Sequence, residues 1–138
     1  VHLRAALSEI WLKIFEQSGE LLLMPSKPRK NNDKIKDLMI YIHQHYGEKI
    51  SVSEVAASAY LSERECFRIF QDCLHMTPMQ YIQNYRLQMA CQMLGETRAS
   101  VTEISHACGL GSSSYFGKVF REYMKCTPVE YRKSLESV

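Results

Sequence analysis

Residues 101–120 read VTEISHACGLGSSSYFGKVF, a pattern that predicts two short helices separated by a tight turn. Ser100 is a good N-cap for the first helix, and Glu103 can complete a capping box with it. Gly109 stands where this helix must stop, because glycine adopts the left-handed conformation at little cost. The second helix has an apolar face of Phe116, Val119, Phe120 and Tyr123. The stretch therefore predicts a helix-turn-helix, whose second helix can lie in the major groove of DNA.

A second copy of this motif lies earlier in the chain. Residues 52–61 match 101–110 at an offset of 49, and residues 66–70 match 116–120 at an offset of 50. Residues 77–81 (TPMQY) match 127–131 (TPVEY) at the same offset of 50. The change of one residue falls in the turn, where an insertion is tolerated best. An internal repeat of this length indicates two related structural units.

The sequence predicts an all-α fold of about seven helices, with two helix-turn-helix subdomains joined by a long central helix. The two subdomains are expected at about 51–74 and 100–123, the central helix at 77–94 with Gly95 stopping it, and a last helix at 127–134. A supporting helix is expected from about residue 33 to Gly47. Five Ser/Thr residues followed three positions later by Glu or Gln favour helices, and no alternation typical of strands occurs. The central helix would span roughly 25 Å, close to the ~34 Å between successive major grooves on one face of DNA.

The N-terminal part carries a separate segment. Residues 1–24 have a helical apolar stripe, which fits either a core helix whose partner lies upstream or a helix that forms a homodimer. Residues 25–32 read PSKPRKNN and predict a linker, whose basic side chains can touch phosphates but are usually just solvated. The sequence begins with Val1 rather than methionine, so we expect it to be part of a longer protein with a preceding regulatory domain.

Composition limits the class of protein. The 138 residues carry a net charge of +2, which neither requires nor excludes nucleic acid. No run of 18 apolar residues occurs, so we expect no membrane partner and a cytoplasmic location. The five cysteines are interpreted as reduced packing residues. Cys66, Cys73 and His75 match no standard zinc spacing, so no metal site and no cofactor are predicted.

An ordered set of motifs resembles the DNA-binding domain of the AraC/XylS family of bacterial transcription regulators. The set comprises Arg86-Leu-x-x-Ala90-x-x-x-Leu94, Ala107-Cys-Gly-Leu110, Phe116-x-x-x-Phe120 and Thr127-Pro128, within residues 33–133. The resemblance implies a C-terminal domain that inserts two recognition helices into successive major grooves of promoter DNA. It also implies activation of transcription through RNA polymerase, with repression as the other outcome.

The same resemblance assigns residues to the DNA interface, position by position. Expected base contacts are Arg64, Phe67, Arg68, Ser113, Ser114 and Lys118, beside Gly117, which has no side chain to read a base. Expected phosphate contacts are Ser62, Gln71, Thr77, Ser112, Thr127 and Val129. Arginine is well suited to guanine and serine is a less selective reader, so the first unit should carry more of the sequence specificity.

Several of these positions have a second interpretation. Arg64 and Arg68 can pair with Glu63, Glu65 or Asp72 on a solvated surface, and Phe67 can either contact a thymine methyl group or pack inward. The family commonly has glycine two residues before the Thr-Pro pairs. Here His75 and Lys125 stand there, so strain is expected if the backbone is left-handed.

Three classes of function remain. A transcription regulator is favoured. A helical protein-interaction module that has lost DNA binding is the alternative, because net charge is low and the second recognition helix is rich in serine and glycine. An enzyme is not predicted, since no catalytic carboxylate pair, triad or phosphate loop can be assigned.

Overall fold

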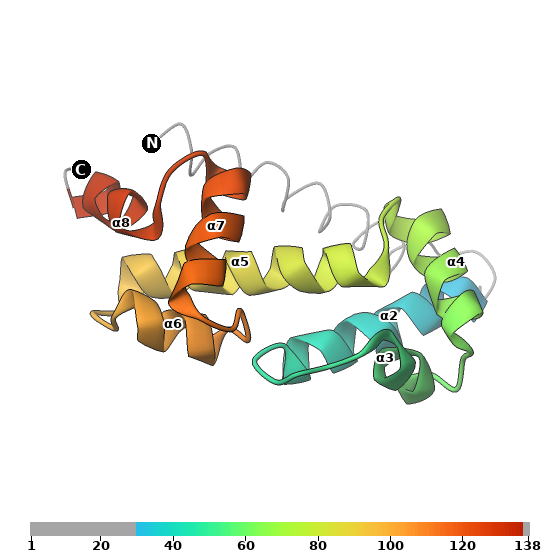
Figure 1. Ribbon diagram of the computed structural model, residues 1–138. Coiled ribbons are helices and arrows are strands. Elements are labelled where there is room, and N and C mark those ends of the chain that lie inside the picture. The colour runs from blue at the N-terminus through green and yellow to red at the C-terminus, as the bar shows by residue number, and fades with distance from the viewer. Residues whose placement is uncertain (1–29, 137–138) are drawn as a thin grey trace.

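The computed structural model describes residues 30–136, which form seven helices and no strand (Figure 1). The helices are α2 (Lys30–His45), α3 (Val52–Ser58), α4 (Glu63–Leu74), α5 (Pro78–Glu96), α6 (Val101–Ala107), α7 (Ser113–Met124) and α8 (Pro128–Glu136). The all-α prediction is confirmed. The helix predicted over 1–24 and residues 25–29 of the predicted linker lie outside the described residues. Within the described part, no helix is both long enough and apolar enough to cross a membrane.

The helix starts are set by hydrogen-bonded caps. The side-chain oxygens of Ser62, Thr77 and Ser100 each accept a hydrogen bond from the backbone amide of the residue three positions later. The side chain of that later residue in turn accepts a hydrogen bond from the backbone amide of the cap residue. Thr127 and Glu130 form the same reciprocal pair at 3.1 and 2.9 Å. The Ser51 hydroxyl accepts a hydrogen bond from the Glu54 amide at 3.2 Å but does not form a complete capping box, so four of the five predicted boxes are complete.

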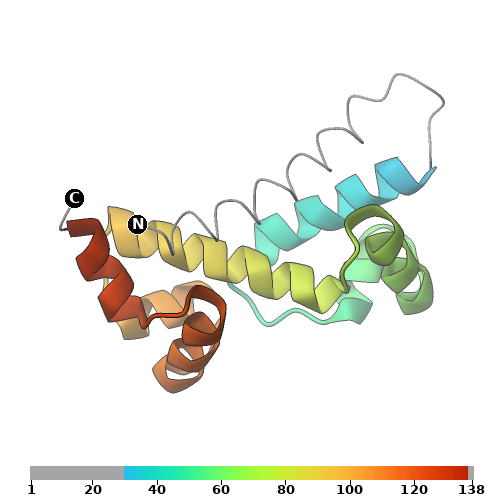
Figure 2. The ribbon, with the colours of Figure 1, turned by 90° about the horizontal axis from the view of Figure 1, so that it is seen from above.

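Two hydrophobic cores share α5. The first core joins α2, α3 and α4 to the start of α5 through Tyr81 and Ile82. The second joins α6, α7 and α8 to the rest of α5 through Leu87, Ala90, Cys91 and Leu94. The repeat is visible in the packing, because the Phe70 and Tyr81 rings lie 5.6 Å apart and so do the equivalent Phe120 and Tyr131 rings. Figure 2 shows α5 passing between the two groups of helices.

Some helix ends differ from the prediction. α2 begins at Lys30, so the last three residues of the predicted linker are helical. α5 continues through Gly95 to Glu96, and Thr97 ends it. Gly95 itself is helical and lies close to α8, since a Cβ there would lie 3.1 Å from Leu135. α7 extends one residue beyond the predicted end and α8 extends two.

The backbone is left-handed at both positions where the sequence left this open. His75 ends α4 with φ 56° and Lys125 ends α7 with φ 63°, and their amides bond to Gln71 and Arg121. Tyr60 also has a positive φ of 58°, which was not predicted. Tyr60 is the counterpart of Gly109 in the repeat, so the left-handed turn is retained in both units although only one has glycine.

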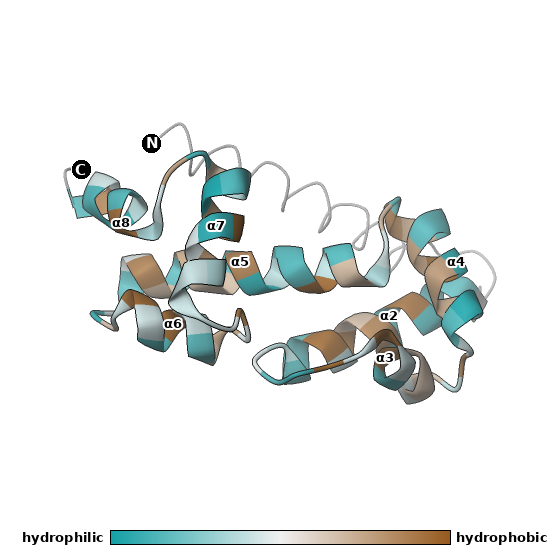
Figure 3. Cartoon of the chain, viewed as in Figure 1, coloured by the Kyte–Doolittle hydropathy of each residue, from teal (hydrophilic) through white to brown (hydrophobic). Residues whose placement is uncertain are grey.

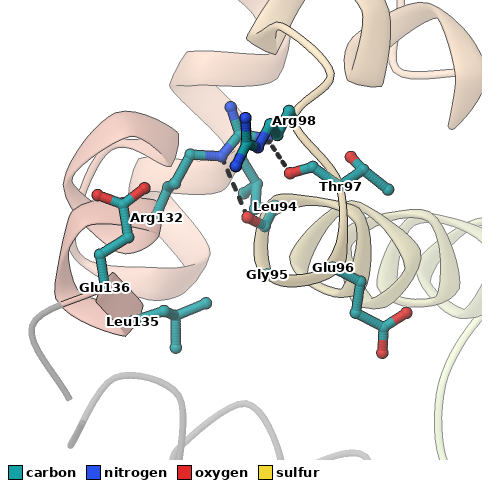
Figure 4. Close-up of a pocket in the computed structure, with 8 residues that line it drawn as sticks. All are labelled: Leu94, Gly95, Glu96, Thr97, Arg98, Arg132, Leu135 and Glu136. Carbon is teal, nitrogen blue, oxygen red and sulfur yellow. Dashed lines mark hydrogen bonds between the residues drawn. The ribbon is translucent and has the colours of Figure 1, made fainter.

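Two arginines donate hydrogen bonds to backbone carbonyls at the C-terminal ends of α2 and α5, the first helix of each unit. Arg86 of α5 donates to the carbonyls of Tyr46 and Glu48, both at 2.8 Å, just after α2 ends. Arg132 of α8 donates to the carbonyls of Leu94 and Thr97, at 3.1 and 3.4 Å, where α5 ends (Figure 4). The open pocket beside Arg132, of about 560 Å³, contains Arg98, Glu96 and Glu136 as well, so its charge is mixed.

The two units touch where α2 ends and α6 ends. A Cβ on Gly109 would lie 2.6 Å from the Tyr46 carbonyl oxygen, and a Cβ on Gly47 would lie 2.6 Å from the Ala107 carbonyl oxygen. Each unit therefore places a glycine against the backbone of the other. We call this contact, together with the Arg86 bonds, the inter-unit junction. It holds the two helix-turn-helix units in one orientation.

Candidate nucleic-acid interface

α4 presents the three predicted reader side chains to solvent. Arg64, Phe67 and Arg68 are exposed, while the opposite face of the helix buries Cys66, Ile69, Phe70 and Leu74. Phe67 is 42% exposed, so it points outward rather than into the core. An apolar side chain on this otherwise charged face is available to a thymine methyl group. Figure 3 shows the mixture of hydrophilic and hydrophobic residues on α4 that such a half-buried helix requires.

The charge on α4 is mixed. Two arginines stand beside three acidic residues, and Arg68 lies 3.9 Å from Asp72 one turn later. Both side chains are more than half exposed, so this pair contributes little to stability. Glu65 is engaged in the cap, where bonds from the Ser62 amide and hydroxyl hold its pKa below the ordinary value. Asp72 is thus the acidic residue that forms an ion pair with one of the predicted reader side chains.

α7 exposes small polar side chains and a lysine near its start. Ser113, Ser114 and Lys118 are exposed as predicted, and Gly117 leaves open space beside them. Sequence reasoning missed Tyr115, which is 50% exposed at the start of this helix and whose hydroxyl lies 3.5 Å from the amide nitrogen of Gln83 on α5. The missed signal was a large aromatic residue that falls outside the apolar stripe of α7.

The predicted phosphate contacts lie at helix starts and on the outer face of α4. Ser62, Ser112 and Thr77 are the N-caps of α4, α7 and α5, and Thr127 precedes α8. Their side-chain oxygens already accept hydrogen bonds from backbone amides within the caps. Gln71 and Val129 are exposed. Anions suit helix N-termini, because free amides and the helix dipole point there.

The cysteines occupy packing positions. All five are free thiols, and Cys66, Cys91, Cys108 and Cys126 are buried. Burial raises the pKa of Cys66 to about 11, which keeps it a neutral thiol. His75 is exposed in the left-handed cap, away from the face of α4 that buries Cys66.

The two predicted recognition surfaces lie toward opposite ends of α5. Figure 1 shows α4 beside the start of this helix and α7 toward its other end. The 19 residues of α5 correspond to about 28 Å of helix. The structure therefore does not gather the predicted site residues into one pocket. It holds them as two separate outward faces on a common support.

Comparisons with known proteins decide the family. Residues 55–134 match the family model described as a helix-turn-helix domain. An AraC-type DNA-binding domain structure from Chromobacterium violaceum is 28% identical, with a TM-score of 0.71, and covers 75% of this chain and 92% of that chain. The chain belongs to the AraC family. It is an AraC-family DNA-binding domain, as its motifs predicted.

Two further comparisons place this AraC-family domain among regulators. It is 34% identical over 127 residues to the uncharacterized HTH-type transcriptional regulator YdeC of Bacillus subtilis (strain 168), covering 92% of this chain and 43% of that protein. The chain thus spans less than half the length of this relative. The DNA-binding domain of AdpA, a global transcriptional factor solved in complex with a target DNA, is 26% identical with a TM-score of 0.72 and covers 75% of this chain and 94% of that chain.

Proposed function

We propose that this AraC-family domain binds double-stranded promoter DNA in a sequence-specific manner, with α4 and α7 in successive major grooves. The observation that carries the proposal is the pair of exposed recognition faces held on one continuous helix of about 28 Å. Successive major grooves on one face of DNA are about 34 Å apart. The offset of each recognition helix from the end of α5 supplies the difference.

The first unit carries most of the base recognition. Arg64 and Arg68 lie four residues apart on the exposed side of α4, so both reach the same stretch of groove. Each bidentate arginine–guanine contact contributes about 1–3 kcal/mol of discrimination against other bases. Phe67, between them, contacts a thymine methyl group.

The second unit is less selective. Ser113 and Ser114 can donate to or accept from several bases, and Lys118 adds a positive charge. Lys118 and the start of α7 therefore contribute more to affinity and orientation than to the choice of sequence. The helix starts at Ser62, Thr77, Ser112 and Thr127, with Gln71 and Val129, contact the flanking phosphates.

The domain acts within a larger regulator. By family resemblance, binding activates transcription through contact with RNA polymerase, and residues 1–24 or a further domain supply a homodimer contact. A regulator of bacterial promoters works in the cytoplasm, where the chromosome lies.

Fluorescence anisotropy tests the proposal with duplexes enriched from a random pool and with random duplexes. We expect affinity to fall steeply between about 50 and 200 mM salt, and Arg68→Ala to lose the preference for the enriched duplex. Arg98→Ala is the matched control, because Arg98 is exposed but lies in the turn after α5.

Each other outcome has a definite meaning. If affinity falls steeply with salt but Arg68→Ala keeps the preference for the enriched duplex, α4 is not the helix that reads the bases. Absence of duplex binding at low salt would overturn the proposal and favour the protein-interaction module. An in vitro transcription assay with the enriched site separates activation from repression.

A further inference from the structure

A basic pocket lies at the inter-unit junction, outside both recognition faces. It has a volume of about 330 Å³ and is lined by Lys49, Ile50, Arg86, His106, Gly109 and Gly111. These residues come from the connection after α2, from α5, and from the end of α6 and its turn. The pocket therefore draws on both units, and we call it the junction pocket.

The chemistry of the junction pocket suits an anion. Lys49 and His106 are exposed, so their nitrogens can reach a ligand from solvent. Arg86 uses two of its five N–H groups on the Tyr46 and Glu48 carbonyls, and its positive charge stays within the lining. Glu48 is the acidic residue of the 46–50 connection, and its carboxylate is bonded at 2.7 Å to His45. No carboxylate is among the six lining residues.

The position of the junction pocket relates it to the recognition helices. In Figure 2 the connection between α2 and α3 lies on the same side of α5 as α7, whereas α2 lies on the other side. Figure 1 shows this connection between α6 and α3, that is, between the two units. When two helices occupy successive major grooves on one face, the minor groove and its bordering phosphates face the protein between them.

We infer that the junction pocket binds a phosphate of the DNA backbone where the minor groove passes between the two recognition helices, through Lys49, His106 and Arg86. This inference rests on the proposed function and adds a contact that neither recognition helix makes. Lys49 supplies a point charge, His106 an N–H donor, and Arg86 a guanidinium already fixed by its two carbonyl bonds. Gly111 has no side chain, and the space where its Cβ would lie is open.

The test uses the double variant Lys49→Gln, His106→Gln, which leaves Arg86 and its structural bonds intact. Anisotropy with a random duplex is measured across the salt series. The double variant loses one phosphate contact, so we expect the slope of log affinity against log salt to decrease in magnitude by about 1. Affinity should drop about tenfold at low salt, with the preference for the enriched duplex unchanged. Lys36→Gln, on an exposed position of α2, is the control for charge and should change neither.

A second measurement locates the phosphate. Neutral methylphosphonates placed between the two half-sites should weaken the wild-type domain and have no further effect on the double variant. An unchanged salt slope in the double variant, with normal wild-type binding, would overturn the junction contact and leave the proposed function standing. Wild-type protein without salt-dependent duplex binding would overturn the proposed function itself. Thermal unfolding confirms that the variants are folded.

Discussion

Tyr60 and Gly109 hold equivalent positions in the two helix-turn-helix units, and both have a left-handed backbone, with φ of 58° and 71°. A side chain in this conformation costs about 1–2 kcal/mol relative to the right-handed region. Tyr60 is 93% exposed, so burial does not offset that cost. The Lys34 ammonium group lies 5.9 Å from the Tyr60 ring, which is a weak exposed cation–π contact.

Tyr60→Gly should therefore stabilise the domain by about 1 kcal/mol. Urea unfolding followed by circular dichroism measures the change. Tyr60→Ala is the control, because it removes the ring and keeps a Cβ in the strained conformation. A stabilisation that appears equally in Tyr60→Ala would show that the ring, rather than the backbone, is responsible.

Gly109→Ala should have the opposite sign and be larger. The added methyl group would lie 2.6 Å from the Tyr46 carbonyl oxygen and 3.1 Å from the Arg86 Nε, in addition to the positive φ. We expect a loss of about 3 kcal/mol in the free energy of unfolding. Gly111→Ala provides the comparison, since Gly111 has a φ of 75° with nothing within 4 Å of the added atom. Equal losses for the two variants would mean that the contact with Tyr46 contributes nothing.

Arg86→Gln should destabilise the domain by about 2 kcal/mol, because hydrogen bonds from charged groups are worth about 1.5–3 kcal/mol. The variant leaves the Tyr46 and Glu48 carbonyls without the guanidinium that now donates to both at 2.8 Å. Arg98→Gln, at an exposed position, should change stability by less than about 0.5 kcal/mol. Chemical unfolding measures both, and similar values for the two variants would contradict the role assigned to Arg86.

Asp72→Asn should tighten DNA binding while leaving stability nearly unchanged. The substitution frees Arg68 from its partner at 3.9 Å and removes a negative charge from the recognition face of α4. A unit charge at contact distance in water is worth roughly 1 kcal/mol, which corresponds to about a fivefold gain in affinity. Asp37→Asn, exposed on α2, is the matched control in the anisotropy assay. Equal gains in DNA affinity for the two variants would show that the change in net charge alone, and not the release of Arg68, is responsible.

Stability should decline in mild acid because of His43. Its Nε2 lies 2.7 Å from the Tyr81 hydroxyl and its ring stacks on Tyr85, with centroids 4.2 Å apart. Burial lowers the pKa of His43 below the ordinary 6.5. The unfolded chain therefore binds a proton more readily than the folded chain, so stability is full above pH 6.5 and falls as the pH decreases below that value.

Unfolding curves from about pH 8 to about pH 5.5 measure this dependence. His43→Gln should be less stable at neutral pH. The slope of its unfolding free energy against pH should decrease by an amount that corresponds to at most one proton taken up on unfolding. A variant whose curve keeps the full slope of the wild type would assign the acid sensitivity to other groups.

Local chemistry made most of the fold predictable. The Ser/Thr caps, the apolar stripes and the repeat offset located every described helix, since each depends on residues close in the sequence. The helix end predicted at Gly95 was wrong, because Thr97 caps α5 two residues later, where its amide and hydroxyl both donate to the Met93 carbonyl. The turn at Tyr60 follows from the repeat, but its positive φ was missed because tyrosine carries no preference for this conformation.

The candidate site divides in the same way. The outward positions of Arg64, Arg68 and Lys118 follow from helical spacing. The junction pocket does not, because Lys49, Arg86 and His106 are 37 and 20 residues apart along the chain and meet only when the two units pack together. Their meeting depends on close backbone approaches at Gly47 and Gly109, which no local pattern reveals.

If α4 and α7 occupy successive major grooves as proposed, the inter-unit junction and the α5 helix shared by both cores make binding depend on the helical phase of the target. One inserted base pair between the half-sites turns the second half-site by about 34° around the DNA axis. Because the junction fixes the two recognition helices relative to each other, they must then release one half-site or bend the DNA. Operators of this domain should consequently keep a constant spacing between the two half-sites, even where the bases between them differ.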